Sequence, residues 1–107
     1  MDPHRLAEER SIAYHALVAE LLRVDDAVVR KARARVEQWA NDGSMHPRWI
    51  DGWRRLLSLS PAELAQALVS RSEELVALRQ VTPFAGVVDA RRRWQLWREV
   101  RERLLAS

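Results

Sequence analysis

Residues 79–88 read RQVTPFAGVV, and this segment divides a chain that otherwise reads as one helix after another. Thr82 precedes Pro83, which biases its backbone away from the helical region, and Gly86 can adopt a positive φ angle. We expect the ring of Phe84, the only phenylalanine, to fold back onto the helices and to hold the last helix in place. The alternative is an exposed recognition loop, formed by Arg79, Gln80, Pro83, Phe84 and Gly86.

Two helices are predicted in the first forty residues. Asp2 can cap the first one, and Pro3 suits its first position, where no backbone donor is needed. Residues 12–22 are apolar nearly all round, which is typical of a helix buried between neighbours. Either Asp25 or Asp26 can cap the second helix, and the motif NDG that follows it is a stop signal.

Four further starts are visible in the rest of the chain. Pro47 lies in the first turn of a third helix. Residues 60–63, SPAE, form a capping box for a fourth helix. Residues 70–73, SRSE, contain a second such box, so we expect a fifth short helix that ends near Gln80. Asp89 can cap the last helix.

The apolar residues of these helices fall at helical spacing. The stripe of the third helix consists of Trp49, Ile50, Trp53, Leu56 and Leu57. The stripe expected for the last helix consists of Ala90, Trp94, Trp97, Val100 and Leu104. No strand pattern is visible. The chain is therefore predicted to be all-α, a compact bundle of five to six short helices in a single domain spanning residues 1–107.

Composition excludes several classes of protein. The 107 residues are 48% hydrophobic and 31% charged, which indicates a folded domain rather than a disordered chain. No cysteine is present, so disulfides, thiolate metal sites and thiol nucleophiles are excluded. His4, His15 and His46 lack metal-ligand spacing, and we expect neither a metal nor a cofactor. The polar start is not a signal peptide and no apolar run could span a membrane, so a cytoplasmic location is expected.

The positive charge is modest and unevenly distributed. Lysine and arginine number 18 against 15 acids, and all but Lys31 are arginine. Residues 30–60 and 89–107 are basic and flank a nearly neutral segment. The clusters Arg30-Lys31-Arg33-Arg35 and Arg91-Arg92-Arg93 could contact the phosphates of DNA. A solvated helix surface is the alternative interpretation.

Residues 60–80 resemble a helix-turn-helix and imply a DNA-binding regulator as the second hypothesis. Leu64, Leu68 and Leu75 fit the apolar pattern of that motif. Val69 replaces the usual turn glycine, and the recognition helix would begin with Glu73-Glu74, which would repel phosphate. These departures make the motif degenerate.

A third hypothesis is a ribonuclease. Arg10 and His15 stand in an Arg-x4-His spacing, which resembles the motif that acts on the scissile phosphate in HEPN domains. Here the pair lies in the first helix, among apolar residues. The competing interpretation is a surface pair or a histidine at the edge of the core. The chain contains no P-loop or nucleophile elbow, so we expect no enzyme activity.

Five tryptophans, several beside arginines, suggest a protein-binding surface instead. Tryptophan and arginine dominate the residues that carry binding energy at interfaces. The expected partner-binding residues are Trp49, Trp53, Arg54, Arg91, Arg92, Trp94, Trp97 and Arg98. The alternative is core packing, with arginine stems covering the rings.

Three stretches, HPRWIDGWRRLL (46–57), ALRQVTPFAGVV (77–88) and RRRWQLWREVR (91–101), resemble small helical bacterial proteins similar to the antitoxins of type II toxin–antitoxin modules. The resemblance implies a subunit that binds a cognate toxin encoded nearby and blocks it through a folded helical face. It also implies a possible contact with operator DNA. The sequence leaves the identity of the partner and the oligomeric state open.

Overall fold

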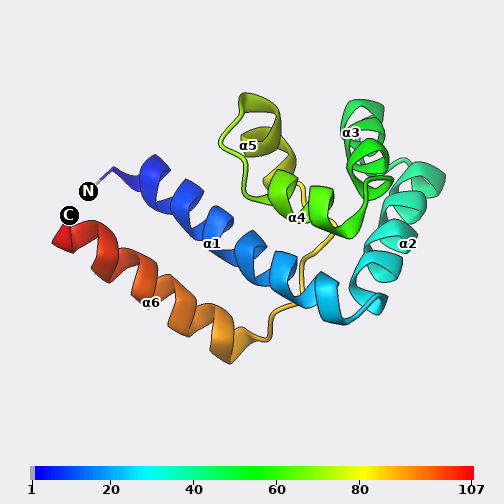
Figure 1. The fold of residues 1–107 in the computed structure, drawn as a ribbon. Coiled ribbons are helices and arrows are strands. Elements are labelled where there is room, and N and C mark those ends of the chain that lie inside the picture. Colours follow the sequence, from blue (N-terminus) through cyan, green and yellow to red (C-terminus); the bar gives the residue numbers. More distant parts are fainter. Residues whose placement is uncertain (1) are drawn as a thin grey trace.

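The computed structural model describes residues 2–107 and confirms the all-α prediction (Figure 1). The described part of the chain contains no strand. The six helices are α1 (Pro3–Val24), α2 (Ala27–Asp42), α3 (Pro47–Leu57), α4 (Pro61–Leu68), α5 (Glu73–Arg79) and α6 (Ala90–Ala106).

Local capping explains most of these bounds. The Asp2 carboxylate accepts a hydrogen bond of 2.9 Å from the backbone N–H of His4, so the predicted cap is confirmed. Ser60 completes the predicted capping box with Glu63. The C-terminal end of α2 is closed by Gly43, whose φ of 70° is readily adopted only by glycine.

The structure selects one of two predicted caps and corrects another. The Asp25 carboxylate accepts from the N–H of Ala27, whereas Asp26, the residue that precedes α2, forms no such bond. Helix α5 is capped by Ser72 rather than by Ser70, because the Ser70 hydroxyl already accepts from the Ser72 N–H at 3.2 Å. The predicted box at 70–73 was therefore placed two residues too early.

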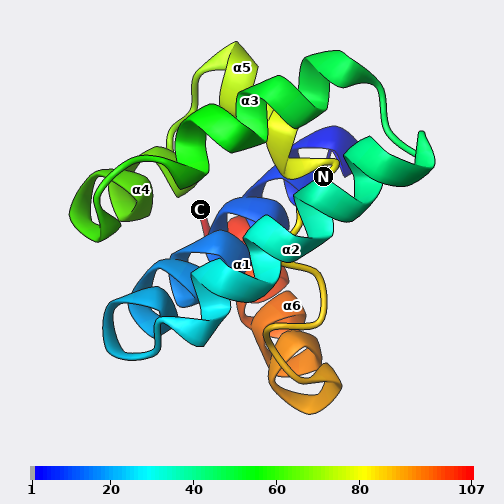
Figure 2. The same cartoon turned by 90° about the vertical axis from the view of Figure 1, so that its right-hand side faces the viewer.

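Helix α1 is the central element of the bundle. It packs against α4 and α5 on one side and against α6 on the other, while α2 continues from its end and pairs with α3 (Figure 1). Figure 2 shows the same arrangement from a second direction, with α1 between α6 and the pair α3 and α5. Among the described helices, α6 contacts α1 alone, so most of its circumference faces away from the bundle.

The core lies where α1, α3, α4 and the 79–88 segment meet. Its largest fully buried side chains are Trp53, Phe84, Leu64, Leu68, Leu78, His15, Val18 and Val36. The rings of Trp53 and Phe84 meet edge to face with their centroids 5.8 Å apart. The expectation that Phe84 folds back onto the bundle is confirmed, because its side chain is completely buried.

Hydrogen bonds secure the 79–88 segment to α1. The Tyr14 hydroxyl donates to the carbonyl oxygen of Phe84 at 2.6 Å and accepts a weaker bond from the N–H of Val88 at 3.5 Å. Val88 lies just before α6, so Tyr14 also positions the start of the last helix. The Thr82 hydroxyl accepts from the Phe84 N–H at 3.1 Å and lies 2.9 Å from Nε2 of His15.

The apolar stripe predicted for α6 is partly wrong. Ala90 and Trp94 are exposed, whereas Leu96, which the predicted stripe omits, is buried together with Val100. The physical reason is that a helix with a single neighbour buries only a narrow face. Contact with α1 selects the face centred on Leu96 and Val100, with Trp97 half-buried at its edge.

Candidate partner-binding surface

The expected partner-binding residues do not form one surface. Three of them lie on α3 and the other five on α6. These two helices make no contact with each other and lie on opposite sides of α1 (Figure 1). The two groups therefore belong to separate surfaces of the protein.

The α3 group is largely engaged within the protein. Trp53 is 0% exposed, so it cannot contact a partner, and its assignment to the interface is corrected here: it belongs to the core. Trp49 is half-buried, and the Arg48 guanidinium carbon lies 4.9 Å from its ring centroid. Arg54 forms two hydrogen bonds with Glu37, of 2.9 and 2.6 Å.

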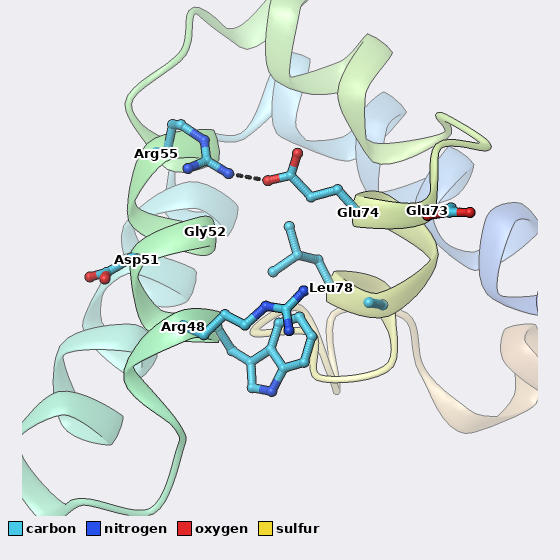
Figure 3. A pocket seen from close by; sticks show the side chains of 9 residues that line it. Arg48, Asp51, Gly52, Arg55, Glu73, Glu74 and Leu78 are labelled. Atoms are coloured by element: carbon cyan, nitrogen blue, oxygen red, sulfur yellow. Dashed lines mark hydrogen bonds and ion pairs between the residues drawn. The ribbon is translucent and has the colours of Figure 1, made fainter.

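A groove of about 580 Å³ lies between α3 and α5 (Figure 3). Leu78 extends across it towards Gly52, where an added Cβ atom would lie 2.9 Å from a Leu78 methyl carbon. Arg55 forms an ion pair with Glu74 across the groove. Asp51 points away from it. Because its charges are mixed and partly paired, the groove has no clear preference for a charged ligand.

The α6 group contains the most exposed aromatic side chain of the described residues. Trp94 is 64% exposed, and Leu105 near the end of the same helix is 61% exposed. Exposed arginines are interleaved with them. Together they form what we call the α6 ridge, which consists of Arg91, Trp94, Arg98, Arg101 and Leu105.

The ridge follows from helix geometry. Its members are spaced by three and four residues in alternation, so they fall on one face of a helix with 3.6 residues per turn. That face is opposite the one that Leu96 and Val100 place on α1. Within residues 2–107, no ion pair engages Arg91, Arg98 or Arg101. Sequence reasoning missed Arg101 and Leu105, although the three-and-four spacing from Trp94 could have identified them.

Three further side chains of α6 lie off the ridge. Arg92 is half-buried and lies 3.5 Å from Glu99, and Arg103 lies 3.7 Å from Glu9 of α1. Trp97 packs against Tyr14 with the ring centroids 6.3 Å apart. Of the expected α6 residues, Arg91, Trp94 and Arg98 thus share the exposed ridge, whereas Arg92 and Trp97 lie nearer to α1.

The loop residues proposed as a recognition element are mostly internal. Pro83 and Phe84 are buried, and Arg79 is 3% exposed, with Nη1 donating to the carbonyl oxygens of Leu68 and Ser70. Gln80 and Gly86 are exposed. These positions show that the segment chiefly joins the helices and presents few side chains to a partner.

The basic cluster of α2 serves as a set of internal cross-links. Arg33 donates to the carbonyl oxygen of Leu57 at 2.7 Å, and Arg35 donates to that of Ala85 at 2.9 Å. Arg30 pairs with Asp26, the residue that precedes the helix. In the region resembling a helix-turn-helix, the α5 acids remain at the start of the helix that would enter DNA, and one of them pairs with α3.

Both members of the Arg10 and His15 pair form hydrogen bonds within the protein. His15 is 2% exposed. Its Nδ1 lies 2.7 Å from the Ser11 carbonyl oxygen, which can only accept, so Nδ1 carries the proton and Nε2 accepts from Thr82. Burial lowers the pKa of His15 to about 4, so the ring is neutral at pH 7. Arg10 donates to the carbonyl oxygen of Trp97 at 3.4 Å.

Comparison of the chain with protein-family models, with curated proteins and with solved structures finds no match in any of the three. None of the helices is both long enough and apolar enough to cross a membrane, over the residues that the structure describes. Over the same residues, no three histidine, aspartate or glutamate side chains are grouped as they would be to hold a metal ion.

Proposed function

We propose that this protein is a non-catalytic subunit that binds a cognate partner protein through the α6 ridge. The observation that carries the proposal is the exposure of Trp94, at 64%, between Arg91 and Arg98 on a face that no other helix covers. Tryptophan and arginine are the residue types that most often dominate binding energy at protein interfaces. Leu105 extends the apolar part of the ridge to the end of the helix.

The ridge favours a partner of particular chemistry. Three arginines and two apolar side chains share one helix face, which suits an apolar groove lined by carboxylates. A second copy of this chain is a poor occupant, because two ridges would place like charges opposite each other. A rigid helix that presents preformed anchors also loses little conformational entropy on binding.

Contact with DNA is the second candidate function, and the geometry supports it less. Three of the four basic residues on α2 are engaged with Asp26, Leu57 and Ala85, which leaves Lys31 as the one basic group there without such an engagement in the described structure. DNA binding depends on the number of free cationic side chains, because each one that neutralises a phosphate releases a counterion condensed on the DNA. The exposed arginines of α6 could supply some of these cations, so the capture experiment below also distinguishes DNA binding from protein binding.

In its specific form, the proposal is that the partner is a toxin and that the ridge covers its substrate cleft. This form rests on the resemblance to antitoxins described above. The ribonuclease hypothesis is disfavoured, because both ring nitrogens of His15, the residue on which it depends, are engaged by Ser11 and Thr82.

The test is affinity capture from the native host with the tagged full-length chain after nuclease treatment. We expect one stoichiometric protein that is captured by the wild type and by Gln95→Ala, an exposed α6 variant outside the ridge, but is lost with Trp94→Ala. Expression of that protein alone should arrest growth, and co-expression of the wild type should restore it. Capture of nucleic acid alone, only without nuclease, would favour the DNA-binding alternative.

Equal capture by Trp94→Ala and by wild type would show that the ridge is not the interface. Because Trp94 lies outside the core, both variants should melt at the wild-type temperature. Loss of binding can then be separated from loss of folding.

A further inference from the structure

A hollow of about 410 Å³ lies between α1, the 79–88 segment and the start of α6. Three arginines, Arg10, Arg79 and Arg93, are among the residues that line it, and no aspartate or glutamate is. Ala85 and Trp97 supply apolar surface. The hollow is therefore cationic and partly apolar, in contrast to the groove between α3 and α5.

Among the described residues, no ion pair engages the three arginines of this hollow. Arg93 is exposed, and no described residue forms an ion pair with it. Arg79 is 3% exposed, and its Nε and Nη2 atoms have no hydrogen-bond partner, although Nη1 donates to two carbonyl oxygens. Nε of Arg10 is likewise buried without a partner. Glu8 and Glu9 lie near enough to favour the charged form of Arg79, but neither lines the hollow, and Glu9 is already paired with Arg71.

Buried guanidinium groups with unused N–H donors are costly unless an acceptor satisfies them. Burial lowers the pKa of Arg79, which is the expected response of a cation removed from water without an ion-pair partner. An oxyanion is the ligand that supplies both a negative charge and several acceptor oxygens, and guanidinium groups bind phosphate and carboxylate with paired hydrogen bonds.

We propose that this hollow binds a small molecule that carries an oxyanion on a flat organic ring. The oxyanion would lie among the guanidinium groups of Arg10, Arg79 and Arg93, and the ring would lie against Trp97 and Ala85. The site is separate from the α6 ridge, since Arg93 and Trp97 lie off its face. It does not depend on the proposed function.

The experiment is isothermal titration of the full-length protein with inorganic phosphate, phenyl phosphate and benzoate at pH 7. Phenyl phosphate should bind about tenfold more tightly than inorganic phosphate, because its ring buries apolar surface as well. Binding of phenyl phosphate alone identifies a phosphate ligand, and binding of benzoate alone identifies a carboxylate ligand.

Two arginine variants distinguish a specific binding site from a general attraction of anions to a positively charged protein. Arg93→Gln should weaken the binding of phenyl phosphate about tenfold, since one charge-assisted contact is lost. Arg91→Gln removes the same charge two residues away, outside the hollow, and should leave the affinity unchanged. Both residues are exposed, so both variants should fold.

Two results would overturn the proposal. One is the absence of binding by phenyl phosphate and benzoate at millimolar concentrations. The other is an equal loss of affinity in Arg91→Gln and Arg93→Gln, which would show that the anions respond only to overall charge. Trp97→Leu gives a further check, because it should reduce the advantage of phenyl phosphate over inorganic phosphate.

Discussion

The hydroxyl of Tyr14 donates a hydrogen bond of 2.6 Å to the carbonyl oxygen of Phe84, seventy residues later in the chain. This bond joins the central helix α1 to the longest connection between the described helices, and the same hydroxyl accepts from Val88 at the approach to α6. The side chain of Phe84 is buried below it, against Trp53 of α3. Three distant parts of the chain are thus held at one point.

Tyr14→Phe tests this link. The substitution keeps the ring but removes the shorter of the two hydrogen bonds to the Phe84 carbonyl and leaves only the 3.3 Å bond from the Val87 N–H, so the free energy of unfolding should fall by about 1 kcal/mol. Urea denaturation followed by far-UV circular dichroism measures the change. A loss below about 0.5 kcal/mol, the range typical of surface substitutions, would mean that water or another donor replaces the hydroxyl.

Phe84→Ala should be more damaging, because it removes a fully buried ring and leaves a cavity among packed side chains. The expected loss is about 3–5 kcal/mol in the free energy of unfolding. Trp94→Ala is the matched control, since it removes a larger ring from an exposed position and should change stability by no more than about 0.5 kcal/mol. Similar melting temperatures for the two variants would contradict the described packing.

His15 should make stability depend on pH. Burial is the main cause that lowers its pKa to about 4, from 6.5 in the unfolded chain. The unfolded state therefore binds a proton first as the pH falls. The stabilisation is complete above about pH 6.5 and is lost as the pH drops to about 4, by a total of roughly 3 kcal/mol.

This dependence can be measured by urea unfolding at several pH values between 7.5 and 4. His15→Gln lacks the titrating ring, and carboxylates titrate in both proteins alike, so the difference between the two curves isolates the histidine. We expect wild type to lose stability more steeply than His15→Gln over this window. Parallel curves would show that His15 is not held neutral by the fold.

Gly52 allows α3 and α5 to approach each other. Gly52→Ala would place a Cβ atom 2.9 Å from a Leu78 methyl carbon. Overpacking costs about 1–3 kcal/mol, which exceeds the gain of about 1 kcal/mol from replacing glycine within a helix. We therefore expect a net loss of about 1 kcal/mol in the free energy of unfolding.

A double-mutant cycle identifies the cause of that loss. Leu78→Ala opens space at the same place, so the double variant should be less destabilised than the sum of the two single variants. Additive losses would indicate that the new methyl group meets some other obstacle. A stabilised Gly52→Ala protein would show that Leu78 moves aside without cost.

The helices could be predicted because their boundaries are set locally. A proline at the first turn, or an aspartate or serine that accepts from the following N–H groups, acts within three residues of its own position. Pro3, Pro47 and Asp89 accordingly mark the starts of helices in the structure as the sequence indicates. The burial of Phe84 could also be anticipated, since a large ring in a short link between helices has a core within reach.

The candidate surface could be predicted only in part. Trp53 and Trp94 both lie in apolar patterns beside arginines, yet one is completely buried and the other is largely exposed. Nothing local distinguishes them. The cationic hollow was not predicted at all, because Arg10, Arg79 and Arg93 come from separate parts of the chain and meet only when α1 and α6 pack together.

By itself, then, the sequence determined that this protein is a bundle of short helices, where most of them begin, and that a segment at 79–88 joins the last helix to the rest. Tertiary structure alone decided which faces are buried, because burial depends on how many neighbours a helix acquires. Helix α3 contacts α2, α4 and α5, so its Trp53 is buried in the core. Helix α6 contacts only α1 among the described helices, so its Trp94 remains exposed to solvent.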